Sequence, residues 1–515
     1  MTDRVARAAA LQSATSTSRP DGAATSSAAS AGDTGGNSTA ADATTPHWSW
    51  YFLPRPHESG ANQITLLRGG AELFAAMCEA IAAARHEVWV ATYIFHTDNA
   101  GLSLVAALCA AARRGVAVHV VIDGFGSIHS VDLLSSLLQP AGVQLTVFRP
   151  LRRLAHWLNP SQLRRQHMKL CGVDWHTGFV GGINLIDDHV DLRHGSSDQP
   201  RLDYAARVRG PAARAVGQAA RAVWSRAFVG GQWRAEVSRL LQGNAADETA
   251  EPGAAQPTAR PAGPPEGRPA GPSVGGPDAE TTAAHTTGFS RQRLAWLRRQ
   301  VRQLRKVLGR GKRRDADPMR PMRATFIVRD NLRQRRSIER AYVEAIRASR
   351  ERIVLVCPYF YPGGEFRRAL CDAARRGVSV RLLLQGKLDY RLAGLAARAL
   401  YDELLSAGVE IFEYMPAFLH AKVAVVDDNW ATVGSSNIDP LSLLLNLEAN
   451  LIVRDPSFCA ELARLIEADI TLSLRVAEPA ARGHGWRGWA GLASRALVAW
   501  VAHVYLRVAG VTGRY

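Results

Sequence analysis

Two kinds of apolar pattern alternate along the chain and predict a layered fold. Apolar residues recur at helical spacing over 71–85 and 102–115, and continuous apolar runs typical of buried strands occupy 87–95 and 116–124. Helices that alternate with buried strands pack on a mainly parallel or mixed sheet. The first half of the sequence therefore predicts an α/β architecture.

The same pattern occurs a second time. EAIAAARHEVWVATYIF (79–95) aligns with EAIRASRERIVLVCPYF (344–360), and LCAAARRGVAVHVVIDG (108–124) aligns with LCDAARRGVSVRLLLQG (370–386). We infer an internal duplication of about 160–180 residues per copy, an ordinary domain size. Two duplicated α/β/α domains with mixed sheets, packed about a pseudo-two-fold axis with the active site at their interface, are the expected form.

The remaining segments are biased in composition. A chain of 515 residues is too long for one ordinary core. Ala, Ser, Thr and Gly dominate its start, and Pro, Gly and Ala dominate the stretch between the two copies, so neither can bury a core. The predicted parts are a disordered tail (1–46), domain 1 (47–242), a flexible linker (243–290), a basic amphipathic segment (291–316), domain 2 (317–478) and an interfacial amphipathic C-terminal segment (479–515).

The charge favours an anionic partner. The formal net charge is +17, which suits nucleic acid, an anionic membrane surface or a phosphorylated substrate, and charge alone does not choose among them. The basic segment fits a solvated helix or arm, docking on anionic lipid headgroups or, less well, nucleic-acid contact. The C-terminal segment places its polar residues in one sector, which favours a helix in the membrane plane over one packed on the protein's own core.

Several features are expected to be absent. The early arginines are not followed by the apolar region of a signal peptide, and no apolar run reaches the length of a transmembrane helix. The six cysteines form no C-x-x-C pair, so we expect buried thiols in a reducing compartment. No metal-ligand spacing is present, and we predict neither a metal nor another cofactor.

A polar motif occurs once in each copy. Residues 420–437 read HAKVAVVDDNWATVGSSN and residues 167–184 read HMKLCGVDWHTGFVGGIN, each predicted to form a short hairpin. His and Lys share one face of the strand, and Asp follows at the turn. A single short motif can arise by chance, and a lone His-x-Lys strand is usually surface. Two copies with the same spacing, each followed by its glycine and asparagine, favour a functional role.

These residue types suit attack on a phosphodiester. One imidazole attacks phosphorus and forms a phosphohistidine, while the other protonates the leaving alcohol and later deprotonates the acceptor. Lysine and amide groups hold the phosphoryl oxygens as charge develops. The predicted catalytic residues are His167, Lys169, Asp174, His420, Lys422 and Asp427, and the predicted phosphate-binding residues are Asn184, Asn437 and Ser435.

Two carboxylates are predicted to orient the histidines. Glu448 follows His420 by 28 residues, and Asp203 occupies the equivalent place after His167. Asp174 and Asp427 also fit a structural reading, because an aspartate at a turn can hold backbone rather than ligand. Tyr93, Phe95, Tyr359 and Phe360 are predicted to be core residues at strand ends, with lining of the cleft as the alternative.

The paired motifs resemble those of the phospholipase D superfamily, which have the form H-x-K-x4-D-x6-G-x-x-N. YIFHTDNAG (93–101), VVIDGFGS (120–127), GGIN (181–184) and residues 418–450 more closely resemble bacterial cardiolipin synthases of the shorter class without N-terminal transmembrane helices. The resemblance covers residues 48–240 and 323–475. Gly182 departs from the serine expected after Gly181.

The resemblance implies a phosphatidyltransferase. A phosphatidyl group would pass from phosphatidylglycerol to a histidine, glycerol would leave, and a second phosphatidylglycerol would accept the group. The superfamily's usual assignment implies His167 as the nucleophile and His420 as the acid and base, an order that the sequence does not settle. We expect a peripheral protein of the bacterial cell membrane that binds phospholipids and an anionic surface, and no nucleic acid.

Three alternative functions remain open. A phospholipase D would use water as the acceptor with the same catalytic residues and would release phosphatidate. A nucleic-acid phosphodiesterase is permitted by the charge, although the C-terminal segment favours lipid. A non-catalytic lipid-binding scaffold would not need intact pairs of histidine and lysine. The acceptor lipid, the membrane leaflet and the oligomeric state stay open.

Overall fold

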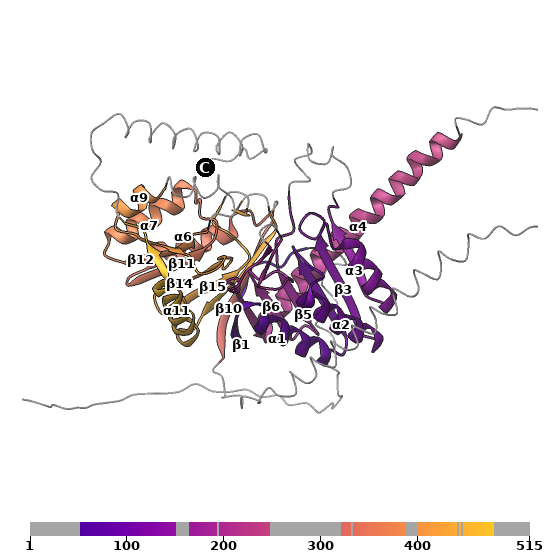
Figure 1. Cartoon of the computed structure of the whole chain (residues 1–515), viewed down its shortest axis with the longest axis horizontal. Coiled ribbons are helices and arrows are strands. Elements are labelled where there is room, and N and C mark those ends of the chain that lie inside the picture. Colours follow the sequence, from indigo (N-terminus) through magenta and orange to yellow (C-terminus); the bar gives the residue numbers. More distant parts are fainter. Residues whose placement is uncertain are drawn as a thin grey trace, which may run out of the picture. The chain divides into compact units, whose positions relative to one another are not determined.

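The alternating apolar pattern folds into strands and helices of a mixed α/β protein (Figure 1). The computed structural model describes residues 52–150, 164–192, 195–247, 321–330, 333–387, 400–439, 442–443 and 446–477. The predicted tail, basic segment and C-terminal segment lie outside these residues, and so does the predicted linker from residue 248 onward. All described residues belong to one compact unit.

The first half contains the elements that its apolar pattern predicts, followed by one long helix. In chain order these are β1 (Glu58–Arg68), α1 (Gly69–Ala83), β2 (Glu87–Thr92), α2 (Asn99–Arg113), β3 (Ala117–Asp123), α3 (Val131–Leu138), a 3₁₀ turn (Gln139–Ala141), β4 (Gln144–Phe148), β5 (Leu170–Val173), β6 (Thr177–Gly181), β7 (Val190–Asp191), β8 (Gly195–Ser196), β9 (Tyr204–Arg209) and α4 (Pro211–Asp247). Helix α4 extends to Asp247, so the first five residues of the predicted linker are helical.

The second half repeats this order. Its elements are β10 (Met322–Arg329), α6 (Ser337–Ala348), β11 (Arg352–Cys357), α7 (Gly364–Arg375), β12 (Ser379–Gln385), α9 (Tyr401–Ser406), β13 (Glu410–Tyr414), β14 (Val423–Val426), β15 (Trp430–Gly434), β16 (Glu448–Arg454), α11 (Pro456–Thr471) and β17 (Ser473–Arg475).

Both copies end their second helix in the same way. Gly115 follows α2 with φ of 90°, and Gly377 follows α7 with φ of 89°. This left-handed conformation is one that glycine adopts without steric cost, and it lets the next backbone N–H turn back to the helix. Val116 N donates to Ala111 O at 3.2 Å, and Val378 N donates to Ala373 O at 3.1 Å. The repeated RRG sequence therefore starts β3 and β12 at equivalent places.

The strands form one continuous sheet across both halves. The order of its 15 strands is β17-β13-β12-β11-β14-β15-β16-β10-β1-β9-β6-β5-β2-β3-β4. Within each half, three neighbouring strands are parallel (β2-β3-β4 and β11-β12-β13), and the others are antiparallel. The halves join where β1 pairs with β10, and the two sets of strands meet there in Figure 1. The predicted duplicated α/β fold with mixed sheets is confirmed, and the edge-to-edge joint was not predicted.

Helices cover both faces of the sheet and enclose three cores. Buried residues of α1, α2 and α3 form one core in the first half, and those of α6, α7 and α9 form its counterpart in the second. On the other face α4 and α11 share a single core, in which Val216 and Val223 belong to the same cluster as Phe458 and Leu462. Burial of this shared apolar surface holds the two motif hairpins in a fixed relation.

Two further observations concern the sequence predictions. Cys78, Cys109, Cys171, Cys357, Cys371 and Cys459 are all buried free thiols, as predicted. Across the described ranges, every helix is too short or too polar to cross a membrane.

Candidate active site

Each polar motif forms a hairpin with its histidine just before the first strand. His167 and Lys169 precede β5, which pairs with β6, while His420 and Lys422 precede β14, which pairs with β15. The tight turns that follow β5 and β14 contain Asp174 at φ of 48° and Asp427 at φ of 49°. The histidine and the aspartate of each motif therefore lie at opposite ends of a strand.

Backbone hydrogen bonds between the halves bring the two histidines together. His167 N donates to Leu447 O at 3.0 Å, and His420 N donates to Leu202 O at 2.8 Å. Leu447 directly precedes Glu448, and Leu202 directly precedes Asp203. Each histidine is thus anchored beside the predicted orienting carboxylate of the opposite half.

The side chains follow the same crossed arrangement. His167 Nδ1 lies 2.9 Å and 3.1 Å from the two carboxylate oxygens of Glu448, and His420 Nδ1 lies 2.6 Å from Asp203 Oδ2. The order of residues along the chain associates each carboxylate with the histidine of its own half, and this association is wrong. Because each Nδ1 faces a carboxylate, Nε2 is the nitrogen left for chemistry in both rings.

The two lysines are held symmetrically within the same site. Lys169 Nζ donates to His167 O at 2.8 Å, and Lys422 Nζ donates to His420 O. Burial lowers the pKa of Lys169 to about 7 and that of Lys422 to about 8. A bound phosphate would favour the charged form of both ammonium groups.

The two asparagines are also symmetric. The Oδ1 atoms of Asn184 and Asn437 are buried and have no hydrogen-bond partner. A buried polar atom without a partner is costly, so a matched pair of them beside the motifs indicates room for a ligand. Since amide O and N atoms are interchangeable by rotation, either amide can present its NH₂ group to a phosphoryl oxygen.

Ser435 has a different task from the one predicted. Its buried hydroxyl donates to Glu448 Oε2 at 2.6 Å and accepts from Ala449 N at 3.0 Å. With both bonds made inside the protein, the hydroxyl is not positioned as a phosphate ligand. Ser435 instead supports the carboxylate that holds His167.

Gly182 is the counterpart of Ser435 in the first half, and it supports Asp203 by its lack of a side chain. A Cβ atom at this position would overlap the Asp203 carboxylate. That carboxylate accepts from Tyr204 N at 2.8 Å and reaches His420 with its other oxygen. The lack of a side chain at position 182 thus leaves room for the carboxylate of Asp203, which is shorter than Glu448.

The two histidine–carboxylate pairs differ in their proton affinity. Burial raises the pKa of Asp203 to about 7, against the opposing effect of Lys422. Burial would also raise the pKa of Glu448, but His167, Lys169 and the Ser435 hydroxyl hold it below its ordinary value. The pKa of His167 is lowered by burial, and that of His420 is lowered further by burial and by both lysines.

Asp174 and Asp427 bind backbone, as in the structural alternative that the sequence left open. Asp174 accepts the N–H groups of Arg85, His86 and Glu87 at 2.8–2.9 Å, before β2. Asp427 accepts the corresponding N–H groups of 350–352, before β11. Each carboxylate thus fixes the start of a neighbouring strand at the far end of its hairpin, and we propose a structural role for both residues.

Two supporting residues were missed by the sequence analysis. Asp123, at the end of β3, accepts Gln166 N at 2.9 Å, and Gln385, at the end of β12, accepts Leu419 N at 2.6 Å. Gln166 and Leu419 directly precede the two histidines. The alignment of VVIDG with LLLQG was the available signal, because it places an acceptor at the same strand end in both copies.

Tyr93 is a further contact of the first half. The centroid of its ring lies 4.9 Å from the centroid of the His167 ring, in an edge-to-face arrangement, and 5.4 Å from Lys169 Nζ. Tyr93 therefore lines the site, whereas Phe95 and Phe360 are core residues as predicted. The position aligned with Tyr93 in the second half is Pro358, which is not aromatic.

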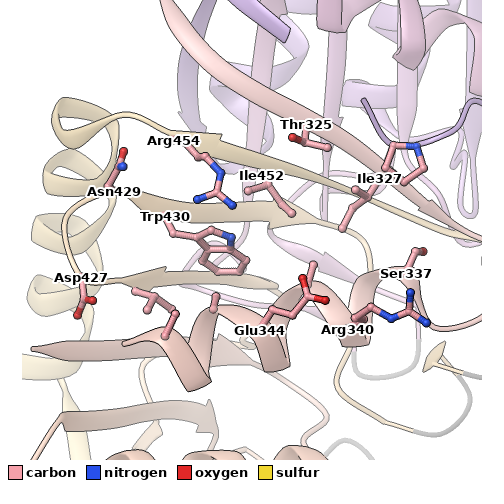
Figure 2. A pocket seen from close by; sticks show the side chains of 15 residues that line it. Thr325, Ile327, Ser337, Arg340, Glu344, Asp427, Asn429, Trp430, Ile452 and Arg454 are labelled. Carbon is pink, nitrogen blue, oxygen red and sulfur yellow. The ribbon is translucent and has the colours of Figure 1, made fainter. Parts of the chain in front are cut away.

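A cavity of about 570 Å³ lies at the other end of the second hairpin (Figure 2). Ile327, Trp430 and Ile452 form its apolar floor, and Glu344 of α6 lies along one side. Asp427 also lines it, but His420 lies at the opposite end of β14. The cavity is therefore separate from the histidine site.

Comparison with known proteins gives a consistent result. The family model described as cardiolipin synthase, PLD-like domain, matches residues 77–195 and 342–470. The sequence is 34% identical to cardiolipin synthase B of Salmonella typhi over 77% of this chain and 78% of that protein. It is 32% identical to cardiolipin synthase B of Escherichia coli (strain K12) over the same shares.

Solved structures are also similar, one example being a phosphatidylserine synthase. Phosphatidylserine synthase of Haemophilus influenzae Rd KW20 aligns with 85% of this chain and 94% of its own, at 12% identity and a TM-score of 0.49.

Proposed function

This chain belongs to the family of cardiolipin synthases with phospholipase D-like domains, and on that premise we propose a double-displacement reaction for it. The protein is a phosphatidyltransferase of the phospholipase D superfamily. In the proposed reaction a phosphatidyl group leaves phosphatidylglycerol for an enzyme histidine, glycerol is released, and a second phosphatidylglycerol accepts the group to give cardiolipin. The crossed histidine–carboxylate contacts are the observation that carries this proposal.

His167 is the proposed nucleophile. Its lowered pKa keeps the ring neutral at pH 7, and the ionised Glu448 behind Nδ1 stabilises the positive charge that develops when Nε2 attacks phosphorus. A P–N bond forms as the bond from phosphorus to the glycerol oxygen breaks. The Ser435 hydroxyl fixes Glu448 for this task.

His420 is the proposed acid and base. The 2.6 Å contact with Asp203, whose pKa is raised to about 7, lets this pair retain one proton near neutral pH. The pair delivers that proton through His420 Nε2 to the departing glycerol oxygen. In the second step it takes a proton from the acceptor hydroxyl, whose oxygen attacks phosphorus and breaks the P–N bond.

The cationic and amide groups stabilise the transition state. Lys169 and Lys422 are buried beside the histidines, and the amides of Asn184 and Asn437 have unsatisfied polar atoms there. Donors fixed in a buried site stabilise developing phosphoryl charge more than water does. The proposed setting is the surface of an anionic bacterial membrane, where the protein acts peripherally.

Product analysis tests the proposal. Purified parent protein with phosphatidylglycerol vesicles is expected to yield cardiolipin and glycerol in equal amounts, and His167→Ala and His420→Ala are each expected to reduce turnover by about 10³-fold or more. Phosphatidate without cardiolipin would show that water is the acceptor. Unchanged turnover in either variant would remove that histidine from the mechanism, and cleavage of nucleic acid but not of lipid would overturn the proposal.

A further inference from the structure

We propose that three exposed apolar side chains around the histidine site form a docking surface for the phospholipid bilayer. These are Ile128, Leu192 and Met415, which are 44%, 46% and 38% exposed, and together they are called the apolar rim. This inference rests on the proposed function, because it identifies the surface through which that site would meet its lipid substrate.

Each histidine lies where the parallel strands of its own half end. Asp123 ends β3 and Gln385 ends β12, and each accepts the N–H of the residue before a catalytic histidine. Within each half the parallel strands run in one direction, so the loops that follow them gather beside the histidine of that half. Side chains in those loops therefore frame the approach to the site.

Ile128 belongs to the loop after β3. Its neighbour Ser127 donates a hydrogen bond to Tyr93 O at 3.0 Å and accepts one from Phe95 N at 3.0 Å. Tyr93 in turn contacts the His167 ring. Ile128 is thus exposed to solvent only a few residues from contacts with the proposed nucleophile.

Leu192 follows the short strand β7. Arg201 fixes that strand, because its guanidinium donates to Val190 O at 2.6 Å. The next residue after Arg201 is Leu202, whose carbonyl accepts the His420 backbone N–H. Leu192 therefore stands on a hairpin anchored beside the proposed acid and base.

Met415 follows β13 and lies over Gly386, where a Cβ atom would overlap its sulfur. Lys387 Nζ donates to Pro416 O at 3.0 Å, so a cation accompanies this part of the rim. The rim thus takes two large apolar residues from loops of the first half and one from a loop of the second half, in each case at the strand ends that carry the histidine of that half.

A bilayer is the occupant that fits this arrangement. The phosphodiester of a membrane phospholipid lies at headgroup depth, directly above the acyl chains. A protein that brings two histidines to that depth places the side chains around them against the acyl boundary, where apolar residues are favoured. Exposed apolar groups that surround a lipid-processing site therefore lose contact with water when the site engages its substrate.

Site-specific fluorescence tests the rim without requiring turnover. The six native cysteines are buried, so a single introduced cysteine can be labelled with an environment-sensitive dye. Ile128→Cys, Leu192→Cys and Met415→Cys are the test positions. Val229→Cys is the matched control, because Val229 is also 44% exposed but lies on α4, away from the histidines. Its neighbour Phe228 stacks on Trp224 with 4.8 Å between the ring centroids.

With vesicles of phosphatidylglycerol and phosphatidylethanolamine, dye at the three rim positions is expected to shift to shorter emission wavelengths, and dye at position 229 is not. Absence of a shift at the rim, with or without cosedimentation of the protein, would overturn the docking surface. A shift of equal size at position 229 would overturn it as well. An apolar environment at the rim before vesicles are added would show that another part of the chain or a second copy covers it, which also overturns the proposal.

A second measurement links the rim to the reaction. Replacing all three rim residues by serine is expected to reduce turnover of vesicle phosphatidylglycerol by about tenfold or more, since roughly 1.4 kcal/mol of lost interfacial binding corresponds to tenfold. Turnover of a short-chain phosphatidylglycerol dissolved as monomers should stay within about twofold. Equal loss on both substrates would overturn the surface, whereas dye shifts in a protein that forms no cardiolipin would overturn only the proposed function.

Discussion

The two halves of the molecule use the same motif but support its histidines differently. The second half pairs Ser435 with the longer Glu448, and the hydroxyl donates to the carboxylate at 2.6 Å. The first half pairs Gly182 with the shorter Asp203, which fills the space that a side chain at position 182 would need. Each carboxylate contacts the histidine of the opposite half. Because the two supports differ, the duplicated sequence produces two histidines with unequal proton affinities.

The same contrast extends to the strand ends. Asp123 and Gln385 make the same backbone contact, but only Asp123 can carry a negative charge beside Lys169. The two copies therefore share the geometry that positions the backbone before each histidine. The two copies differ in the charged side chains that influence the protonation of each histidine.

The halves also differ far from the histidines. In the first half Arg207 and Glu79 form an ion pair at 3.7 Å between β9 and α1. The aligned positions in the second half are Ile452 and Glu344, which line the cavity of Figure 2. The position of the arginine in the first half is thus taken in the second by an isoleucine that lines this cavity.

Among the changes that test this difference between the halves, the largest effect is expected when the first half is given the serine of the second. Gly182→Ser should reduce turnover by about 10²-fold, because displacement of Asp203 by about 1 Å misplaces His420. The double variant Gly182→Ser with Asp203→Glu reproduces the pattern of the second half and should recover at least part of the activity. Steady-state kinetics on phosphatidylglycerol vesicles measures both, and an active single variant would refute the steric account.

The pH dependence should reveal the unequal pairs. Above pH 7 to 8 the Asp203–His420 pair loses its proton and Lys169 and Lys422 lose theirs, so kcat/KM should fall by at least about tenfold per pH unit. Burial lowers the pKa of His167, so the ring is still mostly neutral at pH 6.5 and the acid limb should lie at lower pH than for an ordinary histidine. A rate that rises steadily from pH 7 to 9 would contradict this assignment.

A smaller effect is expected from Ser435→Ala. Loss of one hydrogen bond to an ionised carboxylate costs about 1.5 kcal/mol, so turnover should fall by roughly tenfold. The pKa of Glu448 should rise, because the hydroxyl helps to hold it low. The acid limb of the kcat/KM profile would then move to higher pH, and an unchanged limb would show that Ser435 acts by another route.

The smallest effect on catalysis is expected at the turn aspartates. Asp174→Ala and Asp427→Ala remove carboxylates that accept N–H groups from the start of β2 and β11. Each should destabilise the protein by about 1–3 kcal/mol while leaving turnover of the folded enzyme within about twofold. Urea unfolding and kinetics separate the two effects, and a large loss of turnover without loss of stability would restore them to the catalytic set.

The sequence was sufficient for the features that depend on local pattern. Period and glycine placement predicted the strands, helices and duplication, and equal spacing identified both His-Lys pairs as a set. It was insufficient for the crossed carboxylates, because proximity along the chain says nothing about which half a side chain reaches. The roles of Ser435 and Gln385 also depend on contacts between strands, and an amide or hydroxyl there has no distinctive sequence signature.

The most direct test of the central claim is to locate the covalent intermediate. The His420→Ala variant is mixed with phosphatidylglycerol, quenched and digested, and the phosphatidyl adduct is mapped by mass spectrometry. If two imidazoles act on one phosphorus with His167 as the nucleophile, the adduct should accumulate on the peptide that contains His167 and be absent from His167→Ala. An adduct on His420 in the His167→Ala variant, with none on His167 in the reverse experiment, would contradict the account.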